Sequence, residues 1–312
     1  MNVLVTGGAG FIGSHLCDAL VARGDRVTAL DDLSTGRREH LAAAVELVQA
    51  SVADADAVGR AFAARHFDAV LHVAGQASIA KSYDDPGRDL TTNVVGTLNV
   101  VSAAIATDVP RLVYASSMTA YGEPQRVPTP ESEPCVPVSY YGVTKYAAER
   151  YVHVAGARTD VDLAVTSLRM FNVYGERQSL TNPYQGVLAI FIGNVLRGEP
   201  ITIHSDGAQT RDFVHVRDVV DAWLLVLDEP RTDGGVYNVG SGRETTVAEL
   251  AQAVVTAFGH TEWPLEHAPA QAGDLRRSSA DVTALETAVA WRATTPLADG
   301  MRRTIDWARE NG

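Results

Sequence analysis

Short apolar runs alternate with longer stretches of helical periodicity through the first half of the chain. The first run, NVLVT at 2–6, leads into glycines and then into FIGSHLCDALVARG, whose apolar residues recur at helical spacing. Further apolar runs predict strands at 26–30, 69–74, 111–117 and 163–169, and helical patterns occupy 53–65, 90–105 and 140–154. Strands that are apolar throughout and separated by helices are typical of a parallel sheet covered on both faces. The pattern therefore predicts an α/β fold with a doubly wound parallel sheet, the Rossmann arrangement, with right-handed crossovers.

The length and polarity of the predicted elements change after about residue 170. The predicted helices and strands become shorter and more polar, and Gly and Pro interrupt them in segments such as RGEPITIHSDGAQTR. The segment DFVHVRDVVDAWLLVLD is typical of a strand and a helix that return to the main sheet. We therefore expect one domain from 1–170 with a returning segment at about 212–240. A smaller mixed α/β domain is expected from 171–211 and 241–312.

Composition narrows the class of protein. The 312 residues carry a formal net charge of −12, which argues against a nucleic-acid or anionic-membrane surface. No run approaches the roughly 20 apolar residues of a membrane helix, and we expect no signal peptide, since the first predicted strand begins at position 2. The two cysteines, Cys17 and Cys135, form no disulfide or metal pattern. A cytoplasmic protein is expected.

A glycine-rich loop follows the first predicted strand and opens the first predicted helix. Two spacings fit, Gly7-x-x-Gly10-x-x-Gly13 and Gly8-x-Gly10-x-x-Gly13. Both let the backbone approach a pyrophosphate, which is bound by the N–H groups and dipole of the helix N-terminus. The loop therefore predicts a dinucleotide site.

An acidic residue at the end of the second predicted strand suggests which dinucleotide is bound. Asp31 lies about 20 residues beyond the loop, where a carboxylate binds an adenosine ribose hydroxyl. Because its charge opposes a 2′-phosphate, NAD is favoured over NADP. Arg37 and Arg38 leave NADP as the alternative, although they also suit a solvated helix.

Candidate acid–base chemistry lies in SYYGVTKYAAE. Tyr141 and Lys145 are four residues apart, which places them on one helical face, whereas the adjacent Tyr140 has no such lysine. A nearby ammonium and a positive nicotinamide ring favour the phenolate and lower the tyrosine pKa. The strand before this helix ends in a hydroxyl cluster, Ser116, Ser117 and Thr119, at the sheet edge where such folds bind ligands.

These motifs, together with HVAG at 72–75, TTNVVGT around Asn93, RMFNVYG and the later blocks GAQTRDFVHVRDV and GDLRRSSAD, run in one order through the chain. The set resembles the extended short-chain dehydrogenase/reductase family, and within it the nucleotide-sugar epimerases and dehydratases typified by UDP-galactose 4-epimerase. The resemblance implies that Tyr141 is the base and that Lys145 lowers its pKa and binds the nicotinamide ribose. It also implies that Ser117 bonds the C4 oxygen of the sugar.

The resemblance also implies which residues form each site and which ligand each of the two domains binds. The catalytic set is Tyr141, Lys145, Ser117 and Thr119. The NAD-binding set is Gly7, Gly10, Phe11, Ile12, Gly13, Asp31, Asp32, Ser51, Val52, Val73, Ala74, Gly75, Asn93, Ser116, Tyr141 and Lys145. The substrate-binding set is Ser117, Met118, Tyr141, Asn172, Arg177, Val187, Arg211 and Arg276, with Asn172 and Arg211 on the diphosphate. Residues 1–170 would bind NAD and the smaller domain the nucleotide sugar. A homodimer through the helices at 90–105 and 141–154 is expected on the same ground.

Departures from the family pattern select among its reactions. A 4,6-dehydratase carries two carboxyl groups directly after the active Ser/Thr, where this chain has Met118 and Thr119, and the glucuronate decarboxylases carry Glu at the second position. A 4-ketoreductase would exchange NADPH, which Asp31 disfavours. The resemblance therefore implies NAD-dependent 4-epimerisation of a nucleotide-diphosphate sugar, of the UDP-glucose/UDP-galactose or UDP-glucuronate type. A dTDP-6-deoxyhexose 4-epimerase, the dehydratase or reductase, and a non-catalytic nucleotide sensor remain as alternatives.

Other departures concern single contacts. Family members often have Asp at the Ser51 position, so the adenine contact is expected to pass to the backbone of Val52 or to water. Gln271 replaces a common arginine, and Arg276 or Arg277 is expected to substitute for it. The histidines show no metal-ligand spacing, so no metal is expected and His204 and His215 are interpreted as structural.

Overall fold

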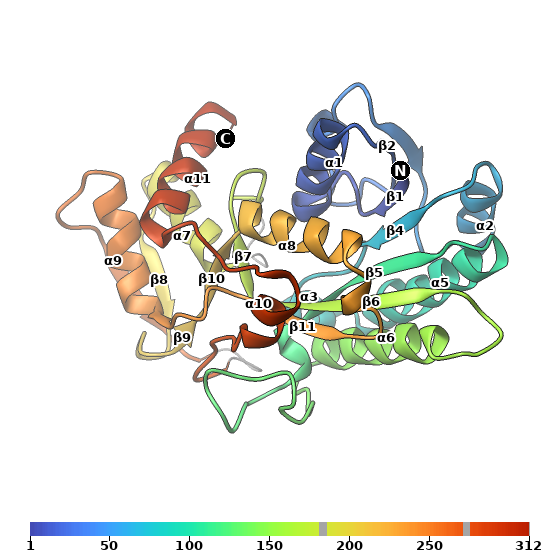
Figure 1. Ribbon diagram of the computed structural model, residues 1–312. Helices are drawn as coiled ribbons and strands as arrows, with labels where there is room; N and C mark the ends of the chain where they lie inside the picture. The colour runs from blue at the N-terminus through green and yellow to red at the C-terminus, as the bar shows by residue number, and fades with distance from the viewer. Residues whose placement is uncertain (181–185, 271–274, 312) are drawn as a thin grey trace.

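The computed structural model describes residues 1–180, 186–270 and 275–311 (Figure 1). Within these residues seven strands form one parallel sheet in the order β11-β6-β5-β4-β1-β2-β3. The strands are β1 (Asn2–Thr6), β2 (Arg26–Asp31), β3 (Glu46–Gln49), β4 (Ala69–His72), β5 (Arg111–Ser117), β6 (Ala164–Met170) and β11 (Val236–Val239). This order contains the 3-2-1-4-5-6 sequence of the Rossmann fold, with the switch point between β1 and β4. The predicted fold class is confirmed.

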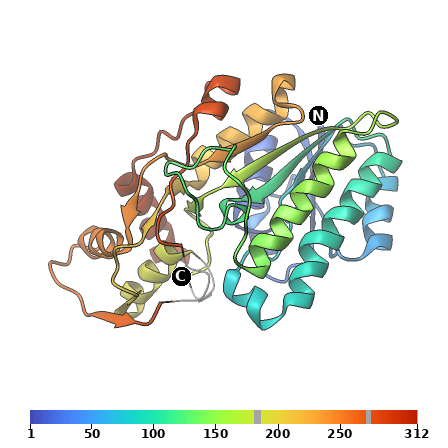
Figure 2. The same cartoon turned by 90° about the horizontal axis from the view of Figure 1, so that it is seen from below.

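Helices cover both faces of the sheet because each strand sends alternate side chains to opposite sides. In β1, Val3 and Val5 enter one buried cluster and Leu4 enters the other. The first cluster lies under α1 (Phe11–Arg23), α8 (Val216–Asp228) and α10 (Thr283–Val289). The second lies under α2 (Ala55–Ala63), α5 (Gly96–Ala106) and α6 (Tyr140–Gly156), which lie side by side in Figure 2.

A connected series of short helices joins β4 to α5. It comprises α3 (Ile79–Asp84), α4 (Pro86–Leu90) and a π-helical turn, η2 (Thr91–Val95). Asp85 caps α4 by accepting from the Arg88 N–H at 2.9 Å. π-Turns inside helices often occur at functional sites, and this one carries Asn93.

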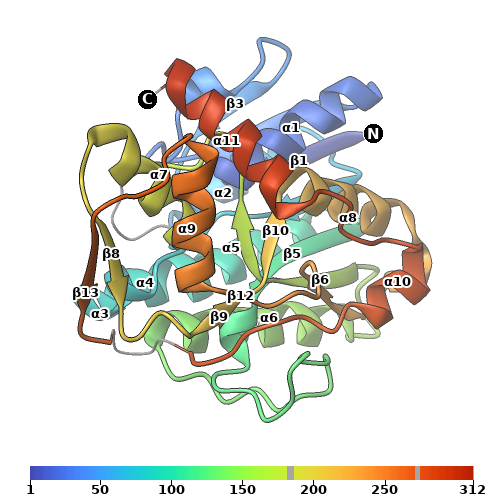
Figure 3. The ribbon, with the colours of Figure 1, turned by 90° about the vertical axis from the view of Figure 1, so that its left-hand side faces the viewer.

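The second region packs around its own apolar cluster and faces the viewer in Figure 3. Its helices are α7 (Val187–Arg197), α9 (Val247–Ala257) and α11 (Leu297–Asn311). Its two-stranded pairings join β7 (Asn172–Tyr174) to β10 (Phe213–His215), β8 (Ile201–His204) to β13 (Leu265–Ala268) and β9 (Thr210–Arg211) to β12 (Thr245–Thr246). Three 3-10 turns complete the part of the chain that the structure describes: η1 (Arg38–His40), η3 (Met118–Ala120) and η4 (Pro230–Thr232).

Two details differ from the sequence-based expectation. The strand expected to return to the main sheet, β10, pairs instead with β7, and the strand that joins the sheet is β11. In addition, Leu285 of α10 and the nearby Trp291 pack into the cluster beneath α1 and α8. Part of the segment 241–312 therefore packs against the sheet and not within the second region.

Candidate active site

The glycine loop forms one wall of a cavity of about 340 Å³ at the carboxyl edge of β1 and β4. Gly7 has φ +67°, a conformation that favours glycine, and a Cβ on Gly13 would overlap the Gly7 carbonyl oxygen. Helix α1 begins after Gly10, whose lack of a side chain leaves the first N–H groups of the helix to a ligand. The loop thus has the shape and the donors that a pyrophosphate requires.

Asp31 ties the end of β2 to this loop. Its carboxylate accepts hydrogen bonds from the Ala9 N–H at 3.0 Å and the Leu33 N–H at 2.8 Å. Burial raises the pKa of Asp31, and these two N–H groups act in the opposite direction. A Cβ on Gly36 would lie 2.8 Å from the Asp31 carboxylate, so the turn after β2 also closes tightly around it. The acid lines the cavity at the place expected for the adenosine ribose.

The structure brings nearly all of the predicted NAD-binding residues to this cavity. Those that line it are Gly7, Gly10, Phe11, Ile12, Gly13, Asp31, Asp32, Ser51, Val52, Val73, Ala74, Gly75, Ser116, Tyr141 and Lys145. Asn93 lies one layer behind and accepts from the Gln76 N–H at 2.8 Å. The Val52 carbonyl already accepts from the Asn99 side chain at 2.9 Å. These residues fit NAD, with glycines at the pyrophosphate and an acid at the ribose.

Tyr141 and Lys145 lie in the first turns of α6, which Ser139 caps by accepting from the Gly142 N–H at 3.1 Å. Burial raises the pKa of Tyr141 to about 12, while the Ser117 hydroxyl lowers it and the charge of Asp89 raises it further. Burial also lowers the pKa of Lys145 to about 8, against the raising effect of Asp89 and Glu149. The expected lowering of the tyrosine pKa is therefore not produced by the protein's own groups, because desolvation outweighs them.

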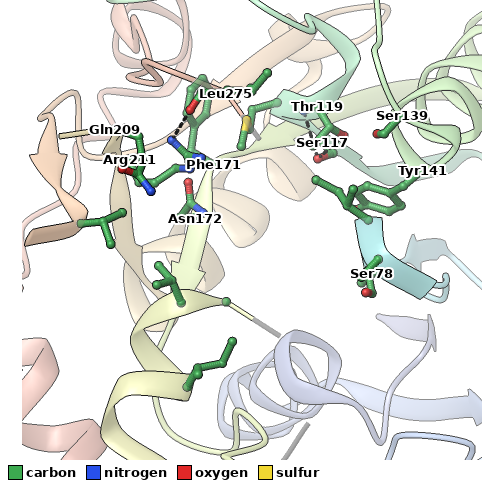
Figure 4. Close-up of a pocket in the computed structure, with 18 of the residues that line it drawn as sticks. Ser78, Ser117, Thr119, Ser139, Tyr141, Phe171, Asn172, Gln209, Arg211 and Leu275 are labelled. Carbon is green, nitrogen blue, oxygen red and sulfur yellow. Dashed lines mark hydrogen bonds between the residues drawn. The ribbon is translucent and has the colours of Figure 1, made fainter. Parts of the chain in front are cut away.

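The hydroxyl cluster at the end of β5 is divided between two tasks. Thr119 Oγ1 donates to Ser117 Oγ at 2.9 Å, and Figure 4 shows Ser117 beside the Tyr141 ring. Ser116 instead donates to Glu149 at 2.6 Å, and that carboxylate is also bound by Arg169 at 2.6 and 2.9 Å. Ser117 and Thr119 thus face the reaction centre, whereas Ser116 secures α6 to the sheet.

A second cavity, of about 620 Å³, opens between the sheet edge and the second region. Its volume lies within the roughly 300–1,000 Å³ of small-molecule sites. It contains six of the predicted substrate residues: Ser117, Met118, Tyr141, Asn172, Val187 and Arg211. Arg211 donates to the Thr210 carbonyl at 2.6 Å and to the Leu275 carbonyl at 2.8 Å, and Figure 4 shows the second of these bonds. The two cavities share Ser117, Tyr141 and Asn172, so a ligand in one meets a ligand in the other at the tyrosine.

Two predicted substrate residues are not brought to this cavity. Arg177 donates to Asp18 of α1 at 2.6 Å, and Arg276 donates to the exposed Asp206 at 2.8 Å. Neither lines either cavity, because each is held in an ion pair away from it. Gln271, the departure expected to weaken a phosphate contact, lies outside the described residues.

Polar residues outside the predicted site sets also line the cavities, among them Gln178, Gln209 and His204. Gln209 and Gln178 are buried, and among the described residues the side-chain oxygen of each has no hydrogen-bond partner, as is also true of Asn172 Oδ1. His204, interpreted as structural from sequence, lines the substrate cavity while its Nδ1 contacts the Pro269 carbonyl at 3.0 Å. Buried acceptors of this kind are costly unless a ligand or water donates to them, so they mark ligand contacts.

A glycine loop on β1, an acid on β2 and a Tyr-x-x-x-Lys helix beside a serine define a Rossmann-fold enzyme of the short-chain dehydrogenase/reductase type. Comparison with known proteins makes this specific. Residues 3–240 match the NAD dependent epimerase/dehydratase family, and the chain belongs to that family.

Named relatives agree with this placement. A UDP-glucose 4-epimerase of Mycolicibacterium smegmatis is 41% identical, over 99% of both chains. The crystal structure of UDP-glucose 4-epimerase from Thermotoga maritima, with UDP-glucose, is similar with a TM-score of 0.95, 38% identity and 99% of both chains covered. That of Thermus thermophilus UDP-glucose 4-epimerase in complex with NAD has a TM-score of 0.93, 39% identity and full coverage of both chains.

These matches confirm the predicted family, the predicted cofactor NAD and the predicted class of enzyme, a nucleotide-sugar epimerase. Within the described ranges no helix combines the length and apolar character needed to cross a membrane.

Proposed function

We propose that this enzyme interconverts UDP-glucose and UDP-galactose by epimerisation at C4. The observation that carries the proposal is the junction of the two cavities at Ser117 and Tyr141, which brings a sugar and the nicotinamide end of NAD to one base. The UDP-glucose 4-epimerases to which the chain is similar support UDP as the nucleotide and glucose as the sugar. The position of Arg177 also favours a neutral sugar, since the cation that could have met a uronate is paired with Asp18.

In the proposed mechanism Tyr141 accepts the proton of the C4 hydroxyl and later returns it. Ser117, hydrogen-bonded to Thr119, orients the C4 oxygen, and the Lys145 ammonium favours the phenolate of Tyr141 by its charge. Bound in the first cavity, NAD would supply the hydride acceptor and donor, so that no net oxidation would occur. Tyr141 holds the C4 proton while the 4-keto sugar turns in the substrate cavity, and it returns that proton once C4 is reduced on its other face.

Residues of the second region are proposed to hold the nucleotide diphosphate. Arg211 supplies positive charge, and the amide of Asn172, whose oxygen has no partner among the described residues, lies on the path between the cavities. Met118 and Val187 contribute apolar walls. We assign NAD binding to 1–170 with 212–240, and sugar-nucleotide binding to 171–211 with 241–312 except where α10 packs on the sheet.

Dehydration is not supported by the residues after Ser117. Met118 and Thr119 carry no carboxyl group, and elimination of water from C5 and C6 requires an acid and a base there. The second cavity contains no Asp or Glu among its described lining residues. The described lining residues therefore favour return of the 4-keto sugar to an alcohol over loss of water.

We further propose a homodimer built on α5 and α6. These helices lie side by side on the outer face of the sheet (Figure 2), and apolar side chains remain exposed along them, namely Leu98, Val143, Tyr151 and Val154. Large apolar side chains left exposed on two neighbouring helices are typical of a protein interface. Sedimentation analysis should give twice the chain mass.

We place the enzyme in the cytoplasm, because Cys17 and Cys135 are both free thiols.

The test of the proposed function is incubation of the purified protein, without added NAD, with UDP-glucose, UDP-glucuronate and dTDP-6-deoxyhexoses. Chromatography should resolve UDP-galactose from UDP-glucose at equilibrium, with unchanged mass. Preferential turnover of another sugar would correct the substrate. Loss of water from the product, or a stoichiometric requirement for NADPH, would overturn the mechanism.

A further inference from the structure

A buried carboxylate outside the assigned catalytic set lies directly behind the cofactor cavity. Asp89, in α4, has no exposed surface and accepts three hydrogen bonds from side chains. The donors are Thr144 Oγ1 at 2.5 Å, Gln76 Nε2 at 2.7 Å and Asn93 Nδ2 at 3.2 Å. Three donors from three different segments meet on one side chain.

Each donor belongs to a segment that shapes the reaction centre. Gln76 belongs to the loop after β4, and it lines the cofactor cavity. Asn93 belongs to the π-turn and is bonded to the backbone of Gln76 in both directions, at 2.8 and 3.1 Å. Thr144 directly precedes Lys145 in α6. Asp89 therefore links the loop, the π-turn and the helix that carries the Tyr141–Lys145 pair.

The linkage is tight beside the lysine. A Cβ on Gly75 would lie 2.9 Å from Asn93 Oδ1 and 3.7 Å from Lys145 Nζ. The loop backbone therefore packs against the Asn93 amide and close to the ammonium. A shift of the π-turn would move both the floor of the cofactor cavity and the surroundings of Lys145.

A second buried carboxylate near Lys145 has a different environment. Glu149 is neutralised by Arg169, which contacts both of its oxygens, and it also accepts from Ser116. Asp89 accepts from neutral groups, and among the described residues no basic side chain lies within 4.0 Å of it. Its negative charge is therefore left to act on the Tyr141–Lys145 pair.

We propose that Asp89 is a positioning residue for the epimerisation reaction, whose carboxylate holds the Gly75–Gln76 loop, the π-turn and α6 in one fixed arrangement around Tyr141 and Lys145. The inference rests on the proposed function. A carboxylate suits the position because it only accepts hydrogen bonds. Asparagine, nearly identical in shape, would turn an amide NH₂ toward groups that are themselves donors.

The same charge has a measurable electrostatic effect. Asp89 raises the pKa of both Tyr141 and Lys145. Two other groups that face the pair also shift these pKa values: Ser117 from β5 lowers that of Tyr141, and Glu149 from α6 raises that of Lys145. The remaining neighbours of the pair are the buried His72 of β4 and the Tyr114 ring of β5, whose centre lies 4.5 Å from Lys145 Nζ. Removing the charge of Asp89 alone should lower the pKa of the tyrosine, whereas removing one of its donors should not.

The test compares Asp89→Asn with Thr144→Val in the NAD-bound enzyme. Thr144→Val removes one hydrogen bond of the same cluster and leaves the charge. Ionisation of Tyr141 is followed as the phenolate absorbance of each protein minus that of the same protein carrying Tyr141→Phe. We expect Asp89→Asn to lower the titration midpoint by about one pH unit. Its kcat for UDP-glucose should fall about 30-fold, with KM within about threefold of the wild-type value, because Asp89 does not line the substrate cavity. Thr144→Val should lower kcat less and leave the midpoint in place.

A kcat within twofold of wild type for Asp89→Asn, or an unchanged midpoint, would overturn the proposal. If Asp89→Asn does not fold, Thr144→Val and Gln76→Leu decide the matter. A lower kcat with unchanged KM and retained NAD in both supports positioning, and wild-type kcat in both overturns it. If the wild-type enzyme epimerises no UDP-sugar, the proposed function fails, while the phenolate titration still decides whether Asp89 acts on Tyr141.

Discussion

The cofactor cavity and the substrate cavity meet at Tyr141 but have different walls. The glycine loop closes the first with main chain, and side chains close the second. A Cβ on Gly7 would meet the Ala74 backbone, and one on Gly13 would meet the Gly7 carbonyl oxygen, so this wall leaves no room for a side chain at either position. The substrate cavity is closed by side chains from distant segments, among them Asn172 and Arg211. A wall of backbone fixes one ligand shape, whereas a wall of side chains can change its specificity one residue at a time. Substitutions should therefore affect the two cavities differently.

The largest effect is expected where the cavities meet. Tyr141→Phe removes the proton acceptor, and general acid–base catalysis of this kind contributes about 10²–10⁴-fold in rate. We expect kcat to fall about 10³-fold while bound NAD is retained, since the cavity keeps its shape. Tyr140→Phe is the matched control, because Tyr140 is 51% exposed and lines neither cavity. Comparable losses in the two variants would contradict the assignment of the base.

The next effect tests the backbone wall. Gly13→Ala places a Cβ against the Gly7 carbonyl oxygen, which belongs to the loop itself and cannot move aside without opening it. We expect NAD affinity, measured by calorimetry on cofactor-stripped protein, to fall about 100-fold. Gly59→Ala in α2 is the control, since a Cβ there meets nothing within 4 Å. Tight NAD binding by Gly13→Ala would show that the loop is more adaptable than its packing implies.

A smaller and more selective effect is expected in the side-chain wall. Arg211→Met removes a charge that lines the substrate cavity, and a hydrogen bond to a charged group contributes about 1.5–3 kcal/mol. KM for UDP-glucose should rise about 30-fold with NAD affinity unchanged. Arg276→Met, which breaks only an exposed ion pair with Asp206, should leave KM as it is. Equal effects in the two variants would restore Arg276 as a ligand residue.

Much of the sheet domain could be predicted from sequence because its signals are local. β1, the glycine loop and α1 follow one another without interruption, and Asp31 ends the next strand. The short β3, ELVQ, carries no such signal, since its residues are exposed or only partly buried and its place depends on pairing with β2. The segment of β10 gives a misleading signal for the opposite reason. It is as apolar as a main-sheet strand, but it pairs with β7.

The substrate cavity was harder to predict because its residues are assembled by tertiary contacts. An arginine beside a motif does not show which way it points, and Arg177 is held by Asp18, 159 positions away. Gln209 gave a weak signal, a polar residue in the short strand-like segment before Arg211, and its burial follows only from packing. Asp89 is four residues before Asn93, a helical spacing that could have suggested their contact but not the meeting of three segments there.

The last prediction concerns stability and not activity, and it tests a buried histidine of the sheet domain. His72 is fully buried, accepts at Nδ1 from Thr6 at 2.7 Å and donates from Nε2 to Thr97 at 2.9 Å, because the Thr97 hydroxyl is itself directed to the Asn93 carbonyl. Burial, with the charge of Lys145, lowers the pKa of His72 from 6.5 to about 3. The neutral imidazole is the native form.

The sign of the pH dependence follows from this lowered pKa. Between pH 6.5 and about 3 the unfolded chain binds a proton at His72 that the folded chain does not, so the free energy of unfolding falls as pH falls. The stability contribution is complete above pH 6.5 and is lost at up to about 1.4 kcal/mol per pH unit below it. Urea unfolding of the NAD-free wild type and His72→Gln at pH 7, 6 and 5 should give a steeper decline in the wild type, by close to one proton at pH 5. If the free energies of unfolding of the two proteins fell in parallel with pH, His72 would be protonated in the folded protein. Its hydrogen bonds to Thr6 and Thr97 would then not require the neutral ring.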